Sequence, residues 1–360
     1  MDKNPPSPEP GSRGWRSSED QPGTGPLIES YSQPDSGLSR YEGWALGTLN
    51  VLLLQGDEQA AQAAFDCLNA IEQRLSKFLP ESDVSLLNSL GSSRPVTVGG
   101  ELLELIRRSR EAWELTGGVF DPTIGSLMRA WGLVDMVART PDSNELSRLL
   151  ESRGMDLVEI DPETQAVSFS RPEVSLDLGA IGKGYAADRI SSLLEEKGVE
   201  TGAMLSGRST VLTWGLPPGE KTWQVEVCHP GNRDEALCRL SMQPGALSSS
   251  SAAERFLRAK GKTYGHILDP RDGLPTETIE GATIWTRQAA LGDILSTTLF
   301  ILGRDALGEG GCVEQLVKAW TPPGEEPRAS IILAEKDSRS WGGIGWETFY
   351  IGEPGFVHSG

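Results

Sequence analysis

The residues best suited to bind an anion lie in the stretch from Asp177 to Asp188, which reads DLGAIGKGYAAD. Its three glycines and Lys183 stand between a predicted strand and a predicted helix, where free backbone N–H groups and the helix dipole favour a phosphate. A tight turn with a solvated lysine would explain the same spacing. The pattern matches neither the Walker motif nor GxGxxG, so it does not indicate the usual nucleotide-binding folds.

A carboxylate and a hydroxyl four residues apart form a candidate metal site. In LGDILSTTLF, Asp293 and Thr297 share one face of a predicted helix, and leucines occupy much of the opposite face. Such oxygen ligands suit Mg²⁺, which also shares phosphate oxygens with a substrate. An aspartate near a helix start can instead cap the helix, with the threonine exposed. The spacing leaves both interpretations open.

His266 is the candidate general base. It lies in YGHILDPRDGLP, between a predicted strand and a turn rich in proline and glycine. A histidine that titrates near neutrality can accept a proton from a hydroxyl nucleophile, although a histidine at a strand end can also be purely structural. Asp121 and Asp269 each precede a proline, so each could shape a loop or contact a ligand.

Composition excludes several classes of protein. The 360 residues include 33 Lys and Arg against 51 Asp and Glu, a net charge of −18 that would repel nucleic acid. The sequence predicts no transmembrane segment, because no apolar run approaches the ~20 residues that a membrane helix needs. Four widely spaced cysteines predict neither a zinc ribbon nor a disulfide framework.

The chain is expected to have a tail and one folded domain. Residues 1–40 are rich in proline, glycine and serine, which predicts a disordered tail. The start of the sequence shows no apolar segment behind a basic one, so we expect no signal peptide and a cytoplasmic location. Residues 41–358 are expected to form a single domain.

Hydrophobic periodicity predicts the elements that must position these side chains. Helices are expected over 57–76, 101–115, 184–197, 290–302 and 313–320. Strands are expected over 47–54, 166–170, 174–178, 203–205, 223–227, 282–286 and 330–334. This mixed order favours an α+β fold over a regular βαβ repeat.

Taken in order, the motifs resemble those of the ApbE family of FAD:protein FMN transferases. The similar segments are LGT at 46–48, SKF at 76–78, SDVSLLN at 82–88, TGGVFDPT at 116–123, WG at 131–132, the stretch 177–188, HILDPRDG at 266–273 and GDILST at 292–297. The ordered set extends over about residues 43–350. The resemblance implies an ApbE-like flavin transferase fold with mixed sheets and packed helices.

The resemblance also implies an activity. Such an enzyme binds FAD with Mg²⁺, transfers FMN through its phosphate to a Thr or Ser hydroxyl of an acceptor protein, and releases AMP. Phosphoryl transfer of this kind depends mainly on positioning and charge neutralisation. By resemblance, the metal ligands are the Ala180 carbonyl, Asp293 and Thr297, and His266 accepts the proton of the incoming hydroxyl. The implied FAD contacts are Leu46, Phe78, Val119, Phe120, Asp121, Asp177, Lys183 and Ile267.

Some residues depart from the family pattern. Leu46 replaces a methionine and Phe78 a tyrosine, which preserves apolar contact. Arg208 follows Gly207 where the family has a second glycine, Ser249–Ser251 replaces Thr-Ser-Gly, and Asp272 replaces the threonine of a DPRTG-like turn. These departures keep two alternatives open: an FAD pyrophosphatase that yields FMN and AMP, and an FAD-binding protein without turnover. Family members are also usually exported.

Overall fold

An eight-stranded antiparallel sheet forms the centre of the protein in the computed structural model, which describes residues 37–359 except 136, 138, 162, 252–255, 260–261 and 338–343. Every neighbouring pair in the sheet is antiparallel. In spatial order the strands are β1 (Ser39–Ala45), β2 (Thr48–Leu54), β6 (Gly202–Ser206), β7 (Thr210–Trp214), β10 (Gly245–Ser251), β15 (Gly281–Thr286), β16 (Ala329–Lys336) and β17 (Ile344–Ile351).

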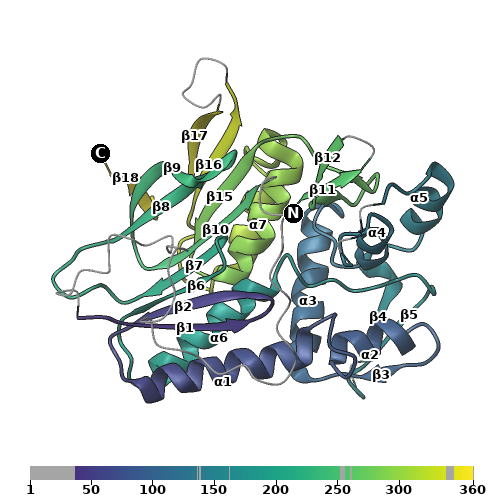
Figure 1. The fold of residues 1–360 in the computed structure, drawn as a ribbon, viewed down its shortest axis with the longest axis horizontal. Coiled ribbons are helices and arrows are strands. Elements are labelled where there is room, and N and C mark those ends of the chain that lie inside the picture. Colours follow the sequence, from purple (N-terminus) through teal and green to yellow (C-terminus); the bar gives the residue numbers. More distant parts are fainter. Residues whose placement is uncertain are drawn as a thin grey trace, which may run out of the picture.

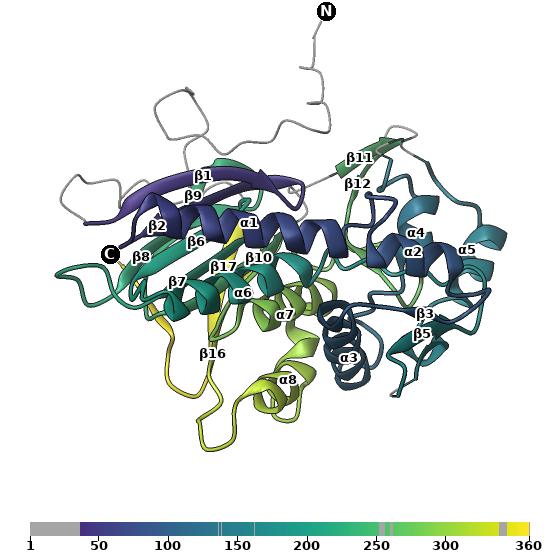
Figure 2. The ribbon, with the colours of Figure 1, turned by 90° about the horizontal axis from the view of Figure 1, so that it is seen from below.

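The two faces of this sheet are covered differently (Figures 1 and 2). Helices α1 (Glu58–Leu75), α6 (Gly182–Glu196) and α7 (Ala289–Leu302) pack on one face, and α8 (Cys312–Trp320) packs behind α7. The other face packs against a small sheet of β8 (Trp223–His229), β9 (Asn232–Met242) and β18 (Phe356–His358). Side chains alternate between the two faces along each strand. Met204 of β6 packs into the core under the helices, while its neighbours Ala203 and Leu205 pack into the core under the small sheet.

The remaining elements gather beside one end of the large sheet, on the right in Figure 1. They are α2 (Asp83–Leu90), α3 (Gly100–Leu115), α4 (Gly125–Ala130), α5 (Ser143–Leu150), β3 (Val96–Thr97), β4 (Val158–Ile160), β5 (Ala166–Phe169), β11 (Phe256–Ala259), β12 (Lys262–Gly265), β13 (Leu268–Asp269) and β14 (Leu274–Pro275), with a short 3-10 turn at Met155–Leu157. A second 3-10 turn, Gly303–Ala306, follows α7 and packs against it. Strand β5 lies between β3 and β4. Helices and antiparallel sheets in this mixed order confirm the predicted α+β class.

The predicted helices agree with α1, α3, α6, α7 and α8 to within a few residues. The strand predicted over 174–178 is wrong, because that segment forms only an isolated bridge between Ser175 and Ile124. Its backbone is satisfied elsewhere: the Asn88 side chain bonds both N–H and C=O of Leu176, and the Asp177 N–H donates to Pro122. Apolar residues there are buried by loop packing rather than by a sheet.

The predicted tail lies mostly outside the described residues, which begin at residue 37. Residues 39 and 40, which the sequence analysis assigned to the tail, already belong to β1. Within the described part of the chain, no helix is both long and apolar enough to cross a membrane.

Candidate active site

A cavity of about 1080 Å³ opens where the β1–β2 turn, the start of α6 and the helix α7 meet. Every residue that the sequence analysis placed in the site lines this cavity: Leu46, Phe78, Val119, Phe120, Asp121, Asp177, Ala180, Lys183, His266, Ile267, Asp293 and Thr297. These side chains come from six separate segments of the chain. A fold that brings them to one volume provides a common binding site for a large ligand.

The glycine-rich turn before α6 is held in place by polar contacts at both ends. The Asp177 carboxylate accepts the Gly179 N–H at 2.9 Å and forms an ion pair with Lys77. Farther along, Lys183 donates to the Ser209 hydroxyl of the β6–β7 turn. Lys77 and Lys183 both line the cavity, so two cations face the volume where the motif predicts an anion.

Asp293 is buried at the bottom of the cavity, with only 6% of its surface exposed. Its Oδ1 accepts hydrogen bonds from the hydroxyls of Thr210 and Ser248, both at 2.9 Å, and its Oδ2 accepts the Gly184 N–H at 2.7 Å. Burial raises the pKa of Asp293, and the nearby Lys183 ammonium with these donors opposes that shift. The aspartate is therefore not a cap of its own helix; it joins α7 to α6 and to the sheet.

The oxygen atoms at and near Asp293 are of the kinds that coordinate a magnesium ion. Thr297 lies one helical turn beyond Asp293 and also lines the cavity. The first N–H groups of α6 have no acceptor within the helix, and that of Gly184 donates to Asp293. Ala180 lies just before this helix start and also lines the cavity. No three His, Cys, Asp or Glu side chains cluster as a metal site among the described residues. One carboxylate, one hydroxyl and one carbonyl would leave positions for water and phosphate oxygens, as Mg²⁺ prefers.

The position of Asp188 fixes the start of the helix that carries Asp293. Its carboxylate accepts the N–H groups of Ala289 and Ala290 at 2.7 and 2.9 Å, and the residue before the helix, Gln288, makes no side-chain cap. Burial raises the pKa of Asp188 to about 7. The sequence analysis included Asp188 only as the end of a motif, because a cap supplied by another helix leaves no signal near the helix start.

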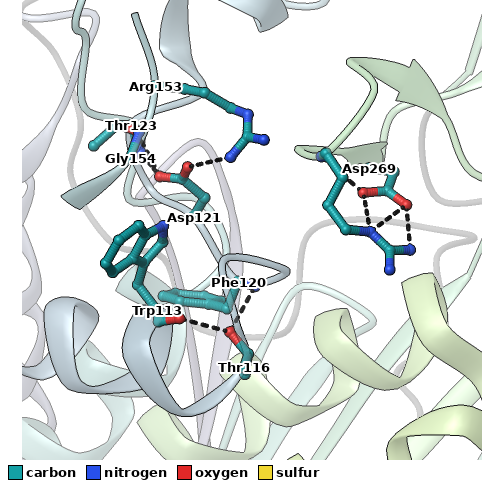
Figure 3. Close-up of polar contacts among 9 residues, drawn as sticks. Trp113, Thr116, Phe120, Asp121, Thr123, Arg153, Gly154 and Asp269 are labelled. Carbon is teal, nitrogen blue, oxygen red and sulfur yellow. Dashed lines mark hydrogen bonds and ion pairs between the residues drawn. The ribbon is translucent and has the colours of Figure 1, made fainter. Parts of the chain in front are cut away.

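Figure 3 shows that Asp121 is held inside its own loop. Its Oδ1 accepts the N–H and the hydroxyl of Thr123 at 2.9 and 2.5 Å, and the Arg153 guanidinium lies 3.7 Å from Oδ2. Thr123 in turn accepts the Gly154 N–H at 2.6 Å. Burial raises the pKa of Asp121. The loop-shaping role that the sequence left open is thus present, in a residue that also lines the cavity.

The loop after His266 is shaped by Asp269. Arg271 donates to both carboxylate oxygens of Asp269 at 2.6 to 3.1 Å, and it holds the pKa of Asp269 below its ordinary value although burial opposes this (Figure 3). Trp131 fixes the far end of the turn by donating to the Gly273 carbonyl at 2.8 Å. Neither Asp269 nor Asp272 is among the residues that line the cavity, and Asp272 caps the Leu274 N–H instead.

The sequence analysis missed other residues of the cavity wall. Lys77 was quoted within a motif without a role, and Ser209 and Trp44 were not singled out. Lys77 could have been found, since a lysine beside Phe78 in a motif for an anionic ligand is a signal. Nothing in the spacing of Ser209 or Trp44 marks them, because the sheet register alone brings them to the cavity.

Comparison with known proteins supports a relationship over most of the chain. A protein from Klebsiella pneumoniae named FAD:protein FMN transferase is 30% identical over 273 residues, which is 75% of this chain and 84% of the relative. One from Treponema pallidum with the same name is 29% identical over 261 residues, or 68% and 71% of the two chains. The crystal structure of the ApbE protein from Thermotoga maritima matches with a TM-score of 0.72 at 27% identity, over 82% of this chain and 94% of that one.

The fold and the family agree. The flavin transferase ApbE from Vibrio cholerae has a TM-score of 0.71 over 88% of this chain, and at 20% identity it supports the fold alone. The family model described as "ApbE family" matches residues 46–309. That match runs from the β1–β2 turn to beyond α7, and the chain is a member of the ApbE family.

Proposed function

We propose that this protein is a Mg²⁺-dependent FAD:protein FMN transferase, which moves FMN from FAD through its phosphate to a Thr or Ser hydroxyl of an acceptor protein and releases AMP. The observation that carries the proposal is the convergence of all the family-implied residues on one cavity around Asp293. The names of the relatives from Klebsiella pneumoniae and Treponema pallidum support the same activity.

Asp293, Thr297 and the Ala180 carbonyl would hold the magnesium ion. When bound there, Mg²⁺ neutralises charge on the diphosphate of FAD. Lys183 adds positive charge along the same wall, and Lys77 offsets the charge of Asp177 there. Because phosphoryl transfer needs positioning and charge stabilisation more than covalent chemistry from the protein, such a set of groups suffices.

The other residues would hold the flavin nucleotide and prepare the acceptor. Phe78 is 62% exposed on the cavity and offers one face to a planar ring, while Lys77 lies 5.2 Å from its ring centroid. Val119, Phe120 and Ile267 supply further apolar surface to the cavity wall. His266 would accept the proton that the acceptor hydroxyl loses as its oxygen bonds to phosphorus.

The test compares three possible fates of FAD. The full-length protein is incubated with FAD, Mg²⁺ and a flavin-accepting domain, and the acceptor is examined for covalent flavin fluorescence on a denaturing gel. A fluorescent acceptor band together with AMP is the expected result. Release of free FMN and AMP without a band would identify an FAD pyrophosphatase, and intact FAD after hours would identify a binding protein without turnover; either outcome contradicts the proposal.

The matched variants are Asp293→Asn and Asp272→Asn. Asp293→Asn keeps the size of the side chain but removes the charge at the proposed metal site, so we expect loss of both metal binding and transfer. Asp272 is an exposed carboxylate outside the cavity wall, and its amide variant should transfer flavin like the unaltered protein.

A further inference from the structure

Part of the cavity wall contains none of the residues implied by the family resemblance. We call this part the outer groove; it consists of Arg40, Trp44, Leu49, Val51, Leu205 and Arg208. Trp44 is 64% exposed, and it and Phe78 are the two most exposed large hydrophobic side chains of the described residues. A tryptophan left open on a cavity wall is a site where burial by a ligand would be favourable.

The outer groove lies on the sheet face opposite α1. A Cβ on Gly43 would approach the Phe65 ring of α1 to 2.6 Å, and Ala45 is buried in the same helical core. Since side chains alternate along a strand, Trp44 must point to the other face. On that face Val51 and Leu205 already belong to the core beneath β8 and β9. The groove is thus the open continuation of a hydrophobic face.

The sheet register links Trp44 to the phosphate side of the cavity. Trp44 of β1 is the partner of Leu49 in β2, and the Leu49 carbonyl accepts the Gly207 N–H at 2.9 Å. Trp44 therefore lies two strand spacings, about 10 Å, from the β6–β7 turn. That turn carries Arg208 and then Ser209, whose hydroxyl accepts the hydrogen bond of Lys183. The outer groove therefore extends from Lys183 and Arg208 to the indole ring of Trp44.

The two arginines of the groove differ in how firmly they are paired. Arg40 Nε donates to Glu42 at 2.8 Å, so its charge is neutralised locally. Arg208 has Asp234 at 3.8 Å, but that carboxylate is 88% exposed, and an ion pair so open to water is weak. Arg208 can therefore turn toward a phosphate at small cost, and its guanidinium suits phosphate oxygens.

We propose that the outer groove binds the adenosine half of FAD, with Trp44 stacking on the adenine ring and Arg208 contacting the adjoining phosphate. The inference rests on the proposed function, because only a dinucleotide brings a second planar ring to the cavity. Phe78, with the apolar residues Val119, Phe120 and Ile267 elsewhere on the cavity wall, would take the flavin ring. The remaining direction from the metal site leads along the groove, which offers one aromatic face and one cation.

The test measures binding of FAD, FMN and ADP to the full-length protein in the presence of Mg²⁺, by titration calorimetry. Stacking of a base on an aromatic side chain predicts a roughly 5- to 100-fold weaker affinity for FAD and ADP in Trp44→Ala. The affinity for FMN should be unchanged, and Trp44→Phe should recover most of the loss. Tyr350→Ala, which removes an exposed aromatic ring away from the cavity, is the control.

A second pair of variants tests the cation. Arg208→Ala should weaken the binding of FAD and of ADP. Asp234→Ala should leave both affinities unchanged or make them tighter, because removing Asp234 frees the Arg208 guanidinium. If the ion pair were only structural, the two variants would lower the melting temperature alike and leave ligand affinity alone, which would overturn the role of Arg208.

Other outcomes are equally decisive. Equal loss of FMN and FAD affinity in Trp44→Ala would place the flavin ring in the groove, and an unchanged affinity for all three ligands with a raised KM for acceptor would identify the groove as an acceptor surface. Both results overturn the inference while leaving the transferase intact. Failure of the unaltered protein to bind FAD at all would instead overturn the proposed function.

Discussion

At the scale of single residues, Leu46 of the β1–β2 turn lines the cavity but has an unfavourable backbone conformation. Leu46 has φ +56° and Gly47 has φ +71°, so the turn places both central residues in the left-handed region. Asparagine followed by glycine is the usual sequence for such a hairpin, and a leucine there costs roughly 1–2 kcal/mol. A side chain kept in an unfavourable conformation at a cavity wall points to a role in binding.

We therefore expect Leu46→Asn to stabilise the fold by about 1 kcal/mol while it weakens FAD binding, since the apolar side chain leaves the cavity. Gln165→Asn is the matched control, because Gln165 is the other described non-glycine residue with positive φ, at +55°, and is exposed outside the cavity. It should gain stability without any change in FAD affinity. Urea denaturation and a flavin titration measure both effects, and a loss of stability in Leu46→Asn would refute the argument from strain.

Gly184 is required for a steric reason. A Cβ there would lie 2.2 Å from the backbone carbonyl oxygen of Ala289, so α6 and α7 approach each other through this residue. Gly184→Ala should destabilise the protein by roughly 1–3 kcal/mol, the usual cost of overpacking.

Gly182 provides the comparison, since a Cβ at Gly182 meets nothing within 4 Å. Gly182→Ala should be neutral or slightly stabilising, because alanine favours the helix. Denaturant midpoints with unchanged slopes would measure both variants. An equal effect of the two alanines would mean that the close approach of the helices is not what requires Gly184.

At the scale of elements, α7 depends on a carboxylate from α6. The pKa of Asp188 is raised to about 7 by burial, above its ordinary value of 3.8, so the folded state binds this proton more tightly than the unfolded state. Stability contributed through this group is therefore largest at low pH and is lost as the pH rises toward 7. Asp188→Asn should remove this component and flatten the pH dependence of stability between about 4 and 7.

The control for that experiment is Asp161→Asn. Asp161 also accepts backbone N–H groups, those of Glu163 and Thr164, but its pKa is lowered by its hydrogen bonds. Replacing Asp161 should leave the slope between pH 5 and 7 unchanged. If Asp188→Asn shows the same slope as the unaltered protein in urea titrations at several pH values, Asp188 is ionised throughout the range and its cap does not titrate.

The helices were predictable from sequence and several strands were not, for a physical reason. Helix α1 shows its buried stripe every three or four residues, a pattern that is local. Strand β10 reads GALSSSS, a polar sequence in which Ser248 and Ser250 are buried and form hydrogen bonds with Asp293 and Ser296. Such a strand is stabilised by partners distant in the chain, and local propensity does not reveal them.

At the scale of the whole molecule, the site also combines residues that could be predicted from the sequence with residues that only the fold brings together. The ordered motifs were sufficient to select the residues that meet in the cavity, because their resemblance to a known family implied a position for each. Trp44 and Ser209 could not be selected, since the β1–β2–β6 register places them, and register depends on the complete sheet. The choice of site residues therefore came from the family motifs, and the extent of the cavity came from the fold.

Because the cavity wall is assembled from segments between Arg40 and Ile301, a bound ligand should stabilise the entire fold rather than one loop. Ligand at 100 times its Kd adds about 2.7 kcal/mol to the free energy of unfolding. FAD with Mg²⁺ should thus raise the melting temperature and slow hydrogen exchange in β1, α6 and α7 together. In Asp293→Asn both effects should vanish. Protection confined to the α6 turn would show that the distant segments do not share one ligand, and the assembly of the site from them would be wrong.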